Sequence, residues 1–356
     1  MSTVEEVPAV IVDNGSHTTK VGLTEDADPE AVFRTLVEVR SDGKRVVSAG
    51  VPTESTGARV HPIVRGVPVD LDALEVVWEH AFRQVLKVDP REHKVLLTER
   101  PLASSSETRE AIVQRMFEKF EVPATYLAMQ GLMALYAAGR TSGTVLDIGE
   151  GLTSVVPVYR YTPQKESIIN VPFAGTDMVD YLASTLAITR DRTELAREIM
   201  EKVCSVSGDP AKEVSSLSDQ VYRGTAGTSV TVGKERLLCA EALFNGSEGR
   251  RSVQQLVTDA VTGCPVNTRK ELYANVILAG GATMFPGMGD RLQRELETLL
   301  PTTATYRVKV IAPQNATLTI WTGACLVAQS PLFQQLWITR QEYDEFGASI
   351  VHRKCA

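Results

Sequence analysis

Ala9-Val-Ile-Val-Asp13-Asn-Gly15-Ser16 and Thr144-Val-Leu-Asp147-Ile-Gly149-Glu150-Gly151 share one pattern. Each is an apolar strand followed by Asp-x-Gly and then by a second strand that contains threonine. The pattern predicts a β-hairpin whose turn carries an acid, because glycine permits a tight turn and a close approach of the backbone. Backbone N–H groups in such a turn point together and can bind an anion. A single Asp-x-Gly is also common in plain hairpins, so the repetition, about one domain apart, is what favours a phosphate site.

Two such turns would contact a polyphosphate from both sides. Asp13 and Asp147 would then hold Mg²⁺ through its waters, since Mg²⁺ keeps most of its hydration shell. A third stretch, Ile277-Leu-Ala-Gly280-Gly281-Ala-Thr-Met-Phe285, predicts a strand, a double-glycine turn and the start of a helix. Its glycines would let a flat base or a ribose lie against the backbone. Taken alone, this third stretch is better explained as a packed strand–helix turn.

Length and composition set the class of protein. The chain has 356 residues, which suggests roughly two domains. Hydrophobic residues make up 43% and charged residues 23%, as in an ordinary globular protein. No apolar run approaches the roughly 18 residues that a membrane span needs, and the acidic start predicts no signal peptide. The net charge of −7 argues against nucleic acid as a direct partner.

Cysteine and histidine are scattered along the chain. The odd number of cysteines, with no two within four residues, predicts free thiols in a cytosolic protein rather than disulfides or a CxxC motif. The five histidines show no metal-ligand spacing, so the sequence predicts no transition-metal site.

Strand and helix patterns alternate, which predicts an α/β protein. Asp70 is a favourable N-cap before a helical repeat of apolar residues, and Ser104 with Glu107 predicts a capping box for a helix to about residue 120. Residues 124–138 are expected to form one helix closed by Gly139. The remaining expected strands cover 9–12, 19–23, 95–97, 145–148, 154–159 and 275–279, and the remaining helices lie near 176–187, 193–204 and from about 286.

The chain resembles actin, and more broadly the actin/Hsp70/sugar-kinase superfamily. The matching motifs are VDNGS at 12–16, LLTERPL at 96–102, LAMQGLMALYAAGRTSG at 127–143, KELYANVILAGG at 270–281 and MFPG at 284–287. The most specific is FQQLWITRQEYDEFGASIVHRKCA at 333–356, which is close to a conventional actin C-terminus. The hairpins alone would indicate the superfamily, whereas this tail indicates the actin branch.

The resemblance implies a ribonuclease H-like α/β fold of two lobes and four subdomains around a cleft for ATP or ADP with Mg²⁺. The first lobe would comprise 1–136 and 319–356, with about 34–66 as a shortened subdomain 2. The second would comprise 137–318, with about 175–260 as subdomain 4. The resemblance also assigns roles to individual residues: Asp13, Gly15, Ser16 and Lys20 to the first phosphate turn; Asp147, Gly149 and Gly151 to the second; Gln130 to the attacking water; and Arg197, Glu201, Gly280, Gly281 and Met284 to the adenosine side.

Departures from the family pattern fall at these functional places. His17 replaces a glycine of the first turn, where it would either crowd the terminal phosphate, donate a hydrogen bond to it, or point to solvent. In the second turn Ile148 replaces a serine and Glu150 an aspartate, and Ser154 replaces the histidine implicated in activating water. Met200 and Thr317 replace two lysines near the nucleotide. Because phosphoryl transfer depends on positioning and charge, these changes predict a retained nucleotide fold with weak or absent hydrolysis.

Surfaces used for assembly in actin are altered as well. The span between residues 33 and 61 is about ten residues shorter than in actin, near Arg40–Lys44, and the apolar plug is reduced to Asn245–Arg251 (NGSEGRR). The cleft for partner proteins keeps largely apolar residues at Tyr136, Val327, Leu332 and Leu336, although packing alone would also retain them.

Two functions remain open at this point. The first is a nucleotide-stabilised, cytoplasmic and cytoskeletal subunit with impaired self-polymerisation. Dynein-arm, dynactin-like and chromatin-remodelling complexes use actin-family subunits in this way, and the last of these would be nuclear. The alternative is a filament-forming actin ATPase. A sugar kinase on the same fold is disfavoured by the actin-type C-terminus.

Overall fold

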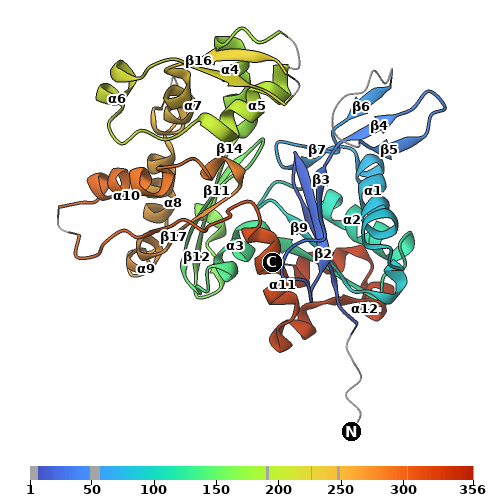
Figure 1. Ribbon diagram of the computed structural model, residues 1–356. Coiled ribbons are helices and arrows are strands. Elements are labelled where there is room, and N and C mark those ends of the chain that lie inside the picture. The colour runs from blue at the N-terminus through green and yellow to red at the C-terminus, as the bar shows by residue number, and fades with distance from the viewer. Residues whose placement is uncertain are drawn as a thin grey trace. The chain divides into compact units, whose positions relative to one another are not determined.

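The structure is a computed structural model that describes residues 7–48, 57–189, 192–225, 227–246, 249–302 and 304–355. The chain divides into two compact units (Figure 1). Unit 1 comprises residues 1–139 and 318–356, and unit 2 comprises residues 140–317. Within the described residues, no helix has both the length and the apolar character needed to cross a membrane.

Unit 1 is built on a mixed sheet with the strand order β19-β10-β9-β1-β2-β3. Its strands are β1 (Val10–Asn14), β2 (Thr18–Leu23), β3 (Ala31–Arg34), β9 (Val95–Glu99), β10 (Ala124–Met129) and β19 (Ile338–Thr339). The central strands β1, β9 and β10 run parallel, so the carboxyl ends of all three lie at one edge of the sheet. In β1 every residue is buried, as expected for a strand covered on both faces.

The helices of unit 1 are α1 (Leu71–His80), α2 (Ser106–Glu118), α3 (Gln130–Ala137), α11 (Thr319–Ala328), α12 (Arg340–Phe346) and α13 (Val351–Lys354). A π-helical turn, Ala81–Leu86, continues α1. A three-stranded sheet of β4 (Val37–Val39), β5 (Arg45–Val47) and β6 (Ala58–Val60) and a hairpin of β7 (Ile63–Val64) and β8 (Val67–Pro68) complete the unit. Residues 40–44 form the β4–β5 turn, closed by the Arg40 N–H donating to Lys44 O at 2.9 Å.

Unit 2 is built on a sheet with the order β13-β12-β11-β17-β18, and β14 also pairs with β12. The strands are β11 (Gly143–Ile148), β12 (Thr153–Tyr159), β13 (Thr162–Pro163), β14 (Ile169–Val171), β17 (Val276–Ala279) and β18 (Val310–Ile311), with a separate pair β15 (Gln220–Arg223) and β16 (Ser229–Val232). The helices are α4 (Gly175–Thr185), α5 (Arg192–Val203), α6 (Pro210–Ser216), α7 (Glu235–Phe244), α8 (Val253–Gly263), α9 (Arg269–Ala274) and α10 (Met288–Leu299). One apolar core joins this sheet to α4, α5, α7, α8 and α10.

Most of the elements expected from the sequence are present, with boundaries within about two residues, and two expectations need correction. Asp70 caps α1, accepting a hydrogen bond from the Ala73 N–H at 2.8 Å. The cap of α2 is Ser105 and not Ser104, because the Ser105 hydroxyl accepts from the Thr108 N–H at 3.2 Å. The prediction of a single helix over 124–138 is wrong, because residues 124–129 form β10 and the helix begins only at Gln130. Pairing of β10 with β9 satisfies the backbone of this buried run, which overrides its helical propensity.

Candidate functional site

The first Asp-x-Gly stretch forms the hairpin that the sequence predicts. Strands β1 and β2 pair antiparallel, and Asp13 lies opposite Lys20. The turn is closed by the Gly15 N–H, which donates to Thr18 O at 3.1 Å. A side chain at Gly15 would place its Cβ 2.7 Å from that same oxygen. Glycine is therefore required here because a side chain would clash with the turn, and not because the backbone adopts a positive φ.

Asp13 is the centre of a buried polar network in unit 1. Its side chain is only 1% exposed. Lys20 Nζ lies 3.0 Å from Asp13 Oδ2. On the other oxygen, the Thr98 hydroxyl donates to Asp13 Oδ1 at 2.6 Å and Gln130 Nε2 donates at 3.2 Å. Charge-assisted bonds of this kind hold the carboxylate in one orientation.

Gln130, the first residue of α3, links this network to the turn backbone. Its Nε2 also donates to Asn14 O at 3.1 Å, which directs the amide oxygen away from these acceptors. That oxygen, Oε1, is buried and accepts no hydrogen bond from the described residues. An acceptor of this kind fits a water carried by Mg²⁺, which donates hydrogen bonds to carboxylate and amide oxygens. The residues present therefore suit a hydrated cation beside Asp13.

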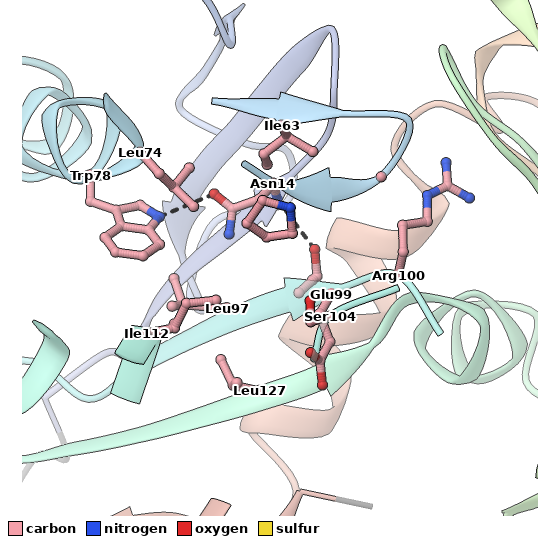
Figure 2. Close-up of a pocket in the computed structure, with 13 residues that line it drawn as sticks. Asn14, Ile63, Leu74, Trp78, Leu97, Glu99, Arg100, Ser104, Ile112 and Leu127 are labelled. Atoms are coloured by element: carbon pink, nitrogen blue, oxygen red, sulfur yellow. Dashed lines mark hydrogen bonds between the residues drawn. The ribbon is translucent and has the colours of Figure 1, made fainter. Parts of the chain in front are cut away.

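A small pocket lies behind the first turn in unit 1 (Figure 2). Trp78 Nε1 donates to Asn14 Oδ1 at 3.2 Å, which fixes the side chain that follows Asp13. Apolar side chains such as Leu97 and Ile112 line most of the remaining wall. The pocket lies beside the turn within unit 1, and Gly15 and Ser16 of the turn are not among the residues that line it.

Ser16 and His17 have local roles within unit 1. The Ser16 hydroxyl accepts a hydrogen bond from the Gly66 N–H at 2.9 Å, so it ties the turn to the β7–β8 hairpin. His17 is partly exposed, and its carbonyl accepts from the Thr35 N–H at 2.8 Å. The Ser16 side chain is therefore bonded to the β7–β8 hairpin.

The second hairpin has the same form in unit 2. Asp147 on β11 lies opposite Ser154 on β12, and both side chains are buried. The Gly149 N–H donates to Leu152 O at 3.2 Å, which closes the turn around Gly151. The Ser154 hydroxyl has no hydrogen-bond partner among the described residues. A buried hydroxyl beside the predicted metal-binding acid is thus left able to bond a ligand or a water.

The strand–turn stretch after β17 lies against the second turn. Gly280 has φ +84° and ψ 152°, and a Cβ there would lie 2.4 Å from both Asp147 Oδ1 and Ile148 O. The position after it is open: a Cβ at Gly281 would meet only Thr317 Cγ2, at 3.7 Å. Met284 is 42% exposed, and its sulfur accepts from the Ala316 N–H at 3.1 Å. Gly280 therefore allows the backbone to pack closely against the second turn, whereas Gly281 leaves open space beside it.

Arg197 and Glu201 lie one turn apart on α5, but their environments differ. Arg197 is buried and forms a two-pronged ion pair with Glu150 of the second turn. Glu201 lies on the exposed part of the helix. Neighbouring protein atoms desolvate its carboxyl and raise its pKa, which Arg197 opposes by its positive charge.

A comparison with protein families identifies the chain. The family model described as Actin matches residues 4–190 and 187–356. The chain belongs to the actin family. Members of this family generally bind a nucleotide and a divalent cation, and they are typically cytoskeletal or cytoplasmic proteins.

In this actin-family chain the structure groups the predicted residues within each unit. Unit 1 brings together Asp13, Lys20 and Gln130 beside Gly15. Unit 2 brings Asp147 beside Gly280. Sequence reasoning missed Thr98, although it lies one residue before the carboxyl end of β9, which runs parallel to β1. Ligand-contacting residues commonly lie near the carboxyl ends of parallel strands. It also missed Thr176, whose hydroxyl donates to Glu150 Oε1 of the second turn at 2.9 Å and for which the sequence offers no local signal.

Two assembly features can be placed inside single units. In unit 1, Leu332 is 79% exposed and Leu336 is 39% exposed. These two residues of the expected partner cleft are therefore not buried by packing within the unit. In unit 2, Arg250 stacks on Phe173, with the guanidinium carbon 3.4 Å from the ring centroid. Ser247 and Glu248 of the same segment, and residues 49–56 of the shortened loop, lie outside the described residues.

Proposed function

We propose that this actin-family protein binds Mg-ATP or Mg-ADP through its two Asp-x-Gly turns, hydrolyses ATP slowly or not at all, and acts as a subunit of a larger protein assembly. The observation that carries the proposal is the Asp13 network. A carboxylate, a lysine and an otherwise unbonded amide oxygen of Gln130 meet at a turn whose N–H groups suit a phosphate.

Within the first turn, each group has a distinct role in this proposal. Asp13 and Gln130 Oε1 would accept hydrogen bonds from the waters of Mg²⁺, and Asp147 would do the same from the second turn. Lys20 would neutralise phosphate charge. Bound Mg²⁺ would supply further neutralisation of the phosphate oxygens.

Slow hydrolysis follows from the second turn. A serine hydroxyl at position 154 is shorter than an imidazole and cannot take a proton at neutral pH, so it orients water less well. Gln130 remains, which leaves a basal rate. Loss of a single positioning group typically lowers the rate by orders of magnitude while binding survives.

Nucleotide affinity should be below that of a conventional actin. Met200 is buried in the core of unit 2, and Thr317 donates its hydroxyl to Asn315. Neither side chain carries the positive charge that a lysine would bring to the nucleotide.

The test is nucleotide binding by the purified, magnesium-containing protein. We expect retained nucleotide and a rise in melting temperature with ATP, since a ligand at about 100 times its Kd adds about 2.7 kcal/mol to the free energy of unfolding. Asp13→Asn should remove the thermal shift, whereas Asp259→Asn, which breaks an exposed ion pair with Arg251, should keep it. Protein with no retained nucleotide and no ATP-dependent shift would contradict the proposal. A hexose-dependent ATPase would instead indicate a sugar kinase.

The subunit role rests on the assembly surfaces. Asn245–Arg251 contains no large apolar residue, and Arg250 and Arg251 are engaged with Phe173 and Asp259 of their own unit. A plug that inserts into a neighbour therefore lacks its apolar anchor, while the exposed Leu332 and Leu336 suit the apolar face of a partner helix.

Assembly is tested in two ways. Light scattering and electron microscopy at tens of micromolar protein, with Mg²⁺, salt and ATP, should show no filaments of the pure protein. Two-stranded filaments would establish the alternative, a filament-forming ATPase. A pull-down with mass spectrometry should recover a complex, of the dynein, dynactin-like or remodelling type, that is lost in Leu332→Asp.

A further inference from the structure

The turn 147–151 is attached to the start of α4 by its backbone. Gly149 O accepts from the Gly175 N–H at 3.0 Å, and Glu150 O accepts from the Thr176 N–H at 2.7 Å. Gly175 allows this approach, because a Cβ there would lie 3.1 Å from Glu150 Oε2 and 3.2 Å from Gly149 O. The first N–H groups of the helix, which have no partner inside the helix, are thus used to hold the turn.

The Glu150 side chain adds a second attachment. Arg197 Nη1 donates to Oε2 at 2.9 Å, and Arg197 Nη2 donates to Oε1 at 2.6 Å. The Thr176 hydroxyl donates to Oε1 at 2.9 Å. The arginine and glutamate side chains are only 10% and 17% exposed. Paired bonds of this geometry fix direction as well as distance, so three elements, the turn, α4 and α5, meet at one carboxylate.

This arrangement leaves Arg197 with little freedom to bind nucleotide. Both terminal nitrogens of its guanidinium bond Glu150, and the buried Nε has no hydrogen-bond partner among the described residues. The residue that the resemblance assigned to adenosine is therefore bound to the phosphate turn. Any contact that α5 makes with a nucleotide would be transmitted to that turn through Glu150.

We propose that Glu150 is a positioning residue, which uses its extra methylene, relative to the aspartate of the family, to hold the second phosphate turn through Arg197 and Thr176. This inference rests on the proposed nucleotide function for its effect on binding. The attachment itself is independent of that function.

The sign of one substitution separates positioning from simple charge. Removing a negative charge beside a phosphate site should strengthen binding of an anion if charge alone matters. If Glu150 positions the turn, Glu150→Gln should instead weaken ATP binding by about tenfold, the loss expected for one charged hydrogen bond. Glu150→Asp, which restores the family residue, should weaken it similarly, because an aspartate is too short to keep all three bonds.

The experiment measures Kd for ATP, tripolyphosphate and adenosine by calorimetry, with amide hydrogen exchange of the nucleotide-free protein. In both Glu150 variants we expect weaker binding of ATP and tripolyphosphate, unchanged binding of adenosine, and faster exchange of the Gly175 and Thr176 amides. Asp259→Asn serves as the control, since it breaks an exposed ion pair of the same unit.

Tighter phosphate binding in Glu150→Gln, or wild-type affinity in Glu150→Asp, would overturn the positioning role. A uniform loss for all three ligands with a lower melting temperature would also overturn it, because that pattern indicates general destabilisation. If the wild type binds no nucleotide, the proposed function fails. The exchange of Gly175 and Thr176 then decides the attachment on its own: unchanged exchange in both variants overturns it.

Discussion

Among the glycines of unit 2 for which the structure gives a distance, Gly280 is the one at which an added Cβ would lie closest to the second turn. We therefore expect Gly280→Ala to distort that turn more than alanine at any of the others. The backbone at φ +84° and ψ 152° is a region that is essentially restricted to glycine, and forcing another residue into it costs about 1–3 kcal/mol. The added Cβ would also lie 2.4 Å from Asp147 Oδ1 and 2.4 Å from Ile148 O. Since one of these atoms is backbone, the turn itself must move, at a further cost of about 1–3 kcal/mol.

The total, about 2–6 kcal/mol, is a large part of the 5–15 kcal/mol that holds a typical domain folded. Gly227→Ala is the matched control, because Gly227 has φ +85° in the same unit but a Cβ there would have no neighbouring atom of the described residues within 4 Å. It should cost only the backbone term, about 1–2 kcal/mol.

The assay is urea unfolding followed by two signals. The protein's three tryptophans, Trp78, Trp321 and Trp337, lie in unit 1, so their fluorescence reports that unit, whereas circular dichroism reports both. Gly280→Ala should shift the dichroism transition further than Gly227→Ala and should lose nucleotide binding. Equal shifts for the two variants, with binding intact in both, would refute the reasoning about the contact with Asp147.

Three further predictions follow from buried groups. All five cysteines are buried and free, and burial raises the pKa of Cys325 and Cys355 to about 12. Maleimide at pH 7.5 should therefore label no cysteine in the native protein and all five in urea. A rapidly labelled thiol in the native protein would contradict this. Ser154→Ala removes a buried hydroxyl that has no hydrogen-bond partner among the described residues. In the nucleotide-free protein it should raise the free energy of unfolding, measured in urea, by about 1 kcal/mol. A lower free energy of unfolding would contradict this. Burial raises the pKa of Glu99 above its ordinary value of 4.5, against the opposing charge of Arg109. The folded state therefore binds this proton more tightly than the unfolded state does. The stability that the protonated group contributes is lost as the pH rises through the pKa of the folded state. Glu99→Gln should remove that component of the decline as the pH rises above 4.5, and an unchanged pH slope would count against it.

The two hairpins could be predicted from sequence because the pattern that defines them is local. An apolar strand, an acid and a glycine lie within eight residues, and the register places Asp13 opposite Lys20 and Asp147 opposite Ser154. The strand β10 could not be predicted in the same way. A short apolar run fits a buried strand or a helix equally well, and only its pairing with β9 decides between them.

The side chains that hold the turns were harder to foresee, because their partners are distant in sequence. Thr98 is 85 positions from Asp13, and Arg197 is 47 from Glu150. Charge and hydrogen-bonding capacity identify such residues as candidates, but many others share these properties. Their selection depends on which strand ends and helix faces the topology brings together.

The energetics of the orphaned groups support a ligand at these turns. Gln130 Oε1 beside Asp13 and Ser154 Oγ beside Asp147 are both buried and have no hydrogen-bond partner among the described residues. Each such group costs about 1–3 kcal/mol in the unliganded fold, and together they cost a substantial part of a domain's net stability. Apolar replacements would remove that cost, so their presence beside the two acids is better explained by function than by folding. A ligand that bonds either atom would offset its cost in the native state alone, and the protein would therefore gain stability on binding it.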